Sequence, residues 1–90
     1  MITIDELEYR KQEFSECFKA DKIFSMSNES LADEIYLNLS KDFPSLKLYK
    51  TPSGQYFTFG KKSEKAFREK IKNRINELKT LIAEYEKLIE

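Results

Sequence analysis

The chain contains no histidine, one cysteine, two glycines and two prolines among its 90 residues. Without imidazole it lacks the commonest general base and metal ligand, and neither a Ser–His nor a Cys–His nucleophile pair can be built. One cysteine, Cys17, excludes an internal disulfide and argues against a structural zinc site. Gly54 and Gly60 form neither of the common phosphate-binding loops. We therefore expect a protein that is not an enzyme and holds no cofactor or metal.

Long apolar runs are also missing. None approaches the roughly 20 residues that a membrane-spanning helix needs, and the first residues lack the basic and hydrophobic regions of a signal peptide. A single cysteine fits a reducing compartment. These features predict a cytoplasmic protein with no membrane partner.

What is present is a globular composition, with 40% apolar and 36% charged residues. Ninety residues allow one domain, whose small core would benefit from self-association. The net charge is zero, but residues 1–45 carry five basic and ten acidic side chains, whereas residues 46–90 carry eleven and six. This asymmetry indicates either an anionic partner or attraction between the two halves.

The N-terminal half predicts two helices. Thr3 and Glu6 form a capping box, from which a first helix runs to about Ala20. Residues 21–28 are expected to be a connector whose Ile23, Phe24 and Met26 pack inward. A second helix is expected to begin near Glu29 or Ser30 and to end by Phe43, because Pro44 disfavours helical geometry at the residue before it.

Residues 46–59 predict a β-hairpin, with strands over 46–50 and 55–59 and a type I turn over 51–54. The parity of the loop decides which side chains share a face. A loop of even length groups the apolar residues Leu46, Leu48, Phe57 and Phe59 on one face. We expect that face to be buried and the opposite face to be outside, with Lys47, Tyr49, Tyr56 and Thr58.

From Lys62 or Ser63 onward the sequence predicts one long amphipathic helix of about 40 Å. Its apolar residues recur at alternating intervals of four and three, which is typical of helices that pair with other helices: Ile71, Ile75, Leu78, Ile82, Tyr85 and Ile89. The expected fold class is α+β with the order α-α-β-β-α. We expect a single domain, 1–90, in which 1–60 form a compact body and 62–90 a helix that mediates self-association as a homodimer.

Two features predict a partner-binding surface. One is the outer hairpin face, where Tyr49 and Tyr56 lie beside Lys47; the other is a basic stripe on the last helix, Lys61, Lys65, Arg68 and Lys72. Aromatic side chains ringed by cations suit nucleic acid, and the same side chains suit a protein partner. A helix that covers the tyrosines would make them structural, and the stripe could instead pair with acidic residues of this chain or of another copy.

The order of a helix over 30–43, two strands joined by Thr51-Pro52-Ser53-Gly54, and a long helix resembles the end of a winged-helix regulator. That resemblance implies that the helix over 30–43 reads DNA and that the last helix dimerises. This helix carries Asp33, Glu34 and Asp42 against Lys41 alone, which suits phosphates poorly.

We therefore expect a protein-binding module of inhibitor or adaptor type that occludes or bridges a macromolecular partner, with nucleic-acid binding as the alternative. The small size and the Lys-, Asn- and Ile-rich composition lead to the hypothesis of a phage or mobile-element protein.

Overall fold

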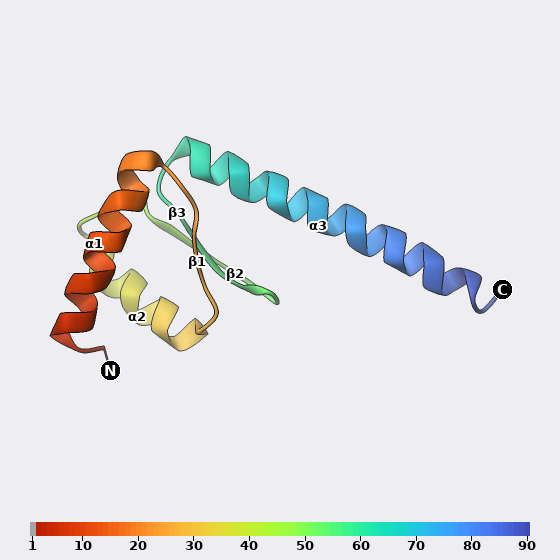
Figure 1. Ribbon diagram of the computed structural model, residues 1–90, viewed down its shortest axis with the longest axis horizontal. Helices are drawn as coiled ribbons and strands as arrows, with labels where there is room; N and C mark the ends of the chain where they lie inside the picture. The colour runs from red at the N-terminus through yellow and green to blue at the C-terminus, as the bar shows by residue number, and fades with distance from the viewer. Residues whose placement is uncertain (1) are drawn as a thin grey trace.

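The computed structural model describes residues 2–90, which form an α+β fold of three helices and one antiparallel sheet (Figure 1). The sheet order is β1-β3-β2, so the last strand in sequence lies in the middle. This confirms the expected fold class. The elements are α1 (Ile4–Ala20), β1 (Phe24–Met26), α2 (Glu29–Leu39), β2 (Lys47–Thr51), β3 (Gly54–Thr58) and α3 (Lys61–Lys87).

The first helix begins and ends where the sequence predicts. The Thr3 hydroxyl accepts a hydrogen bond from the Glu6 backbone N–H at 3.1 Å, which satisfies one of the free donors at the helix start. At the other end Asp21 adopts a left-handed conformation with φ 47°, and its N–H bonds to the last helical turn. Asp is among the few non-glycine residues that tolerate this conformation.

Residues 24–26 form a strand, where the sequence predicted only a connector. Phe24 pairs with Phe57 of β3, and Met26 pairs with Gln55. The expected inward packing of Phe24 and Met26 is confirmed, because both side chains lie against the core. Three residues are too few for the alternation that identifies a strand, so this third strand was missed.

The second helix ends at Leu39, four residues before the expected end at Phe43. A turn follows, in which the Phe43 N–H donates to the Leu39 carbonyl at 3.1 Å. Phe43 is nevertheless buried and lies edge-on to Phe14, with ring centroids 6.2 Å apart. Phe43 therefore reaches the core from this turn, although it was expected to belong to the helix.

The hairpin has the predicted even loop. Leu48 pairs with Phe57 and Tyr49 pairs with Tyr56, with Pro52 and Ser53 as the two loop residues. Leu46, Phe57 and Phe59 are buried and Leu48 packs against them, as predicted. Both strands are displaced by one residue toward the loop relative to the expected bounds, without any change of register.

The core lies between the sheet and the two N-terminal helices, and α3 packs against the opposite face of the sheet (Figure 1). Phe14 of α1 is at its centre, with its ring 4.9 Å from that of Phe57 and 5.2 Å from that of Phe59. Only the start of α3 covers the sheet, where Ser63 and Phe67 are buried.

The remainder of α3 projects away from the body (Figure 1). The molecule measures 57 × 29 × 15 Å and has a radius of gyration of 16.5 Å. A compact domain of this length would have a radius of gyration of about 12 Å. The elongation comes from the part of α3 that follows its contact with the sheet.

Candidate functional site

The tyrosine face of the hairpin is covered by α3. The ring of Phe67 stacks on Tyr49, with centroids 4.4 Å apart, and lies 5.5 Å from the ring of Tyr56. Tyr56 is only 9% exposed and Tyr49 is half-buried. The expectation that both tyrosines lie outside is therefore wrong, because the start of the long helix folds back over the sheet and buries them.

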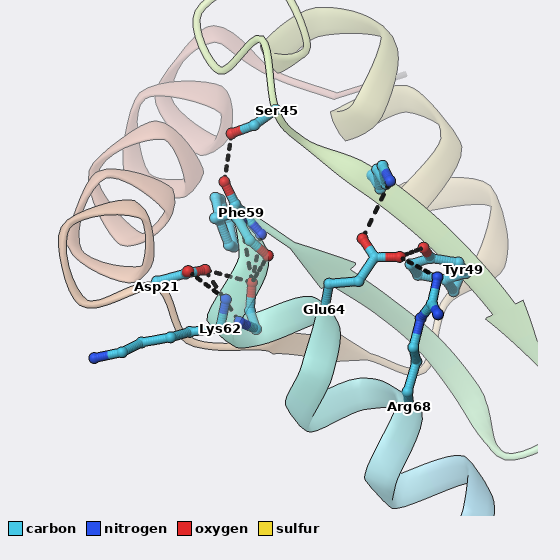
Figure 2. Close-up of polar contacts among 10 residues, drawn as sticks. Asp21, Ser45, Tyr49, Phe59, Lys62, Glu64 and Arg68 are labelled. Carbon is cyan, nitrogen blue, oxygen red and sulfur yellow. Dashed lines mark hydrogen bonds and ion pairs between the residues drawn. The ribbon is translucent and has the colours of Figure 1, made fainter.

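The hydroxyl of Tyr49 is directed at Glu64 in the first turn of α3 and donates a hydrogen bond to its carboxylate at 2.5 Å (Figure 2). Lys47 Nζ lies 3.2 Å from the same carboxylate and Arg68 Nη2 lies 3.6 Å from it. The hydrogen bond from Tyr49, followed by that from Lys47, lowers the pKa of Glu64, and the same Tyr49–Glu64 bond raises the pKa of the tyrosine. Glu64 thus links β2 to α3 and brings three of the predicted binding residues, Lys47, Tyr49 and Arg68, to one carboxylate.

Four predicted partner-binding residues converge on one open groove of about 540 Å³, which we call the basic groove. It lies between β2 and the start of α3 and is lined by Ser45, Lys47, Gly60, Lys61, Glu64, Lys65 and Arg68. Lys72, the fifth basic residue of the predicted surface, lies outside it. Within residues 2–90 the structure records no ion pair for Lys61, Lys65 or Lys72. The groove therefore presents free positive charge around one neutralised carboxylate.

The start of α3 is capped by a residue distant in sequence, which no local motif predicted. The Asp21 carboxylate accepts hydrogen bonds from the backbone N–H of Lys62 at 2.8 Å and of Ser63 at 3.2 Å (Figure 2). The Ser63 hydroxyl also donates to Asp21, and this is the main cause of the lowered pKa of Asp21. A Cβ at Gly60 would lie 2.8 Å from a carboxylate oxygen of Asp21, so any larger residue at position 60 would have to displace this carboxylate.

Some of the acidic residues of the N-terminal half form ion pairs with basic residues of the C-terminal half. Lys50 on the hairpin contacts Asp33 at 2.8 Å and Glu29 at 3.4 Å, both on α2. The hydrogen bond to Asp33 is the largest cause of the raised pKa of Lys50. Acidic residues of α2, the helix that would read DNA in a winged-helix protein, are thus directed at a lysine of the same chain.

The apolar residues that follow Ile71 are largely exposed among residues 2–90, both in α3 and in the turn after Lys87 that holds Leu88 and Ile89. We call the predicted set Ile71, Ile75, Leu78, Ile82, Tyr85 and Ile89 the α3 stripe. Ile71 is half-buried, whereas the other five are between 40% and 86% exposed. Leu81 and Leu88 widen the exposed surface on one side.

A second groove, of about 640 Å³, lies where α3 separates from the tip of the hairpin. We call it the hairpin groove. Its walls are largely apolar on the helix side, and it is lined by Lys50, Thr51, Pro52, Ser53, Ile71, Arg74, Ile75 and Leu78. The first half of the α3 stripe is thus one wall of a groove, and the second half continues into solvent.

Comparison with models of protein families, with curated proteins and with solved structures finds no match to this chain. The winged-helix likeness therefore rests on the order of the elements alone. Within residues 2–90, no helix has both the length and the apolar character to cross a bilayer, and no cluster of three or more potential ligands could hold a metal ion.

Proposed function

We propose that this chain is a cytosolic, non-enzymatic protein-binding module of inhibitor or adaptor type, which works as a homodimer assembled through α3. The observation that carries the proposal is the exposed α3 stripe. Seven large apolar side chains between residues 75 and 89 are at least 40% exposed, five on the projecting helix and two, Leu88 and Ile89, in the turn that ends it. The largest apolar patch on a typical monomer covers about 300–600 Å² and often marks an interaction site. A second helix of the same kind would remove this surface from water.

The basic groove is the surface that we assign to the protein partner. Arg68 at its edge is 75% exposed, and arginine is enriched among the residues that dominate protein interfaces. Glu64 holds Lys47, Tyr49 and Arg68 in a fixed arrangement, which lowers the entropy lost on binding. An acidic segment of a partner would complement the unpaired lysines.

Nucleic-acid binding is the second candidate, favoured by the free charges of Lys61, Lys65 and Lys72. We rank it lower because α3 covers the aromatic side chains of the hairpin. Tyr56 is buried and Tyr49 is half-buried beneath Phe67, which leaves little aromatic surface on which bases could stack.

An affinity capture with and without nuclease separates the two candidates. We expect a protein partner to be retained after nuclease treatment by the wild type, and to be lost when Lys61, Lys65 and Arg68 are changed together to Ala. The matched control removes three exposed charges elsewhere, Lys19, Lys22 and Lys41, and should keep the partner. Retention that depends on nucleic acid, or equal loss in the control, would contradict the assignment.

A further inference from the structure

We infer that the two copies of α3 in this dimer run antiparallel about Thr80, and that Leu88 of each copy occupies the hairpin groove of the other. The inference rests on the proposed homodimer and adds its geometry. It follows from three properties of α3, namely the spacing of its apolar residues, the distribution of its charges and the direction in which one of its edges faces.

The spacing of the α3 stripe is the same in both directions. Its intervals are 4, 3, 4, 3 and 4 residues, so a reversed copy of the helix presents the same pattern. With a two-fold axis at Thr80, residues equally far from position 80 face each other. All six residues then pair in three layers, Ile71 with Ile89, Ile75 with Tyr85, and Leu78 with Ile82. A closed two-fold pair leaves no member of the stripe without a partner.

The charges favour the antiparallel direction. Lys70, Lys72 and Arg74 lie at the start of the stripe, and Glu84, Glu86 and Glu90 lie at its end. In an antiparallel pair, Lys72 of each copy lies beside Glu86 of the other, which gives two pairs of opposite charge. The two copies of Lys79 meet each other at the axis, which gives one pair of like charge. Parallel pairing would instead set Arg74 beside Lys79 of the other copy twice, because flanking residues five apart meet across parallel helices.

One edge of α3 faces the sheet and the hairpin. Phe67, Arg74 and Leu81 of α3 follow each other at intervals of seven residues, and Leu88 comes seven residues later as the residue that caps the helix. Leu88 keeps right-handed helical geometry, with φ −72° and ψ −19°, so the four residues lie along one edge. Phe67 packs on Tyr49 of the sheet, and Arg74 lines the hairpin groove. The edge that carries Leu81 and Leu88 is therefore the edge that is directed toward the hairpin.

This edge determines what fills the hairpin groove. In an antiparallel pair the same edges of the two helices are adjacent, so Leu88 of the second copy lies level with Ile71 and Ile75 on the hairpin side. There it meets the apolar wall of the groove and Pro52. The groove volume of about 640 Å³ is ample for a leucine side chain and its flanking turn. In a parallel pair, Leu88 would lie at the far end of the helix from this groove.

Thiol cross-linking in a Cys17→Ser background tests the direction. Chains with Ile75→Cys and with Tyr85→Cys are oxidised separately and as an equal mixture. We expect a disulfide-linked dimer in the mixture alone. Two copies of residue 75 would lie ten residues apart along the pair, or about 15 Å, which exceeds the roughly 7 Å between Cα atoms that a disulfide tolerates.

A second mixture tests the occupant of the groove. Chains with Ser53→Cys and Leu88→Cys should be joined by a short bifunctional maleimide, whereas Ser53→Cys with Ala83→Cys, on the outer side of the helix, should not. Linked dimers in the separate Ile75→Cys or Tyr85→Cys samples would overturn the inference and leave self-association standing. If the protein sediments as a dimer but either expected cross-link fails to form, the antiparallel arrangement is likewise wrong and self-association still stands. A monomer with no link in any sample would overturn both the inference and the proposed dimer.

Discussion

Phe67 of α3 stacks on Tyr49 of β2, with ring centroids 4.4 Å apart and an angle of 21° between the ring planes. The hydroxyl of the same Tyr49 ring donates a hydrogen bond to the carboxylate of Glu64, which lies one turn before Phe67 on α3. One side chain of the hairpin therefore makes both an apolar and a polar contact with α3. These contacts orient the helix so that its basic start lines one groove and its apolar continuation leaves the body.

Removing the Phe67 ring should release the start of α3 from the sheet. We expect Phe67→Ala to lower the free energy of unfolding by about 3 kcal/mol, since it empties a buried aromatic site. Phe18→Ala, at a ring that is 47% exposed, should cost clearly less. Urea unfolding of both variants provides the measurement. Equal losses would show that the Phe67 contact does not hold the helix.

The Asp21 cap should make stability depend on pH. Hydrogen bonds from Ser63 and from the start of α3 lower the folded-state pKa of Asp21 below its unfolded value. Its contribution is therefore fully present above the unfolded pKa of about 3.9 and is lost as the pH falls through the folded pKa. Urea unfolding from neutral pH to about pH 3 should show a shallower loss of stability in Asp21→Asn than in the wild type.

At neutral pH, Asp21→Ala should cost about 1 kcal/mol, the usual effect of removing a helix cap. Gly60→Ala should also destabilise the protein, because its Cβ would lie 2.8 Å from the Asp21 carboxylate. The double variant Asp21→Ala with Gly60→Ala removes that clash, and its loss should therefore be smaller than the sum of the two single losses. Additive losses would indicate that the two positions do not interact.

Parts of this architecture were predictable because they depend on local patterns. The alternation of Leu46, Leu48, Phe57 and Phe59 specified the hairpin parity, since any odd loop would have mixed lysine with phenylalanine. The Thr3 cap and the absence of glycine and proline after Gly60 specified the first and last helices in the same way.

Other parts depend on contacts between distant segments. Tyr49 and Tyr56 alternate as an outer face should, and nothing in the hairpin sequence shows that Phe67 returns to cover them. Asp21 and Ser63 are 42 residues apart, so no local motif marks their contact. The basic groove was predictable in part. The sequence predicted Lys61, Lys65 and Arg68 as a stripe on one helix, but only the folded structure shows that Lys47 of β2 forms the opposite wall.

A charge exchange should reveal the direction of the helix pair. Lys72→Glu and Glu86→Lys should each weaken the dimer, because either change places like charges together at two symmetric positions. Each exposed pair contributes about 0.2–1 kcal/mol, so losing both pairs should raise the dimer Kd by roughly twofold to thirtyfold. The double variant restores both pairs in the antiparallel dimer and should recover most of the affinity. Effects that add in the double variant would contradict this arrangement.

Analytical ultracentrifugation across a range of concentrations tests the central claim, that α3 assembles two copies. The wild type should sediment as a dimer, and the variant with Leu78→Asp and Ile82→Asp should sediment as a folded monomer, since both side chains are exposed in the single chain. The matched control, Thr80→Asp with Ala83→Asp, adds the same charge to the other side of the same helix and should remain dimeric. A wild type that stays monomeric at high micromolar concentration would contradict the account.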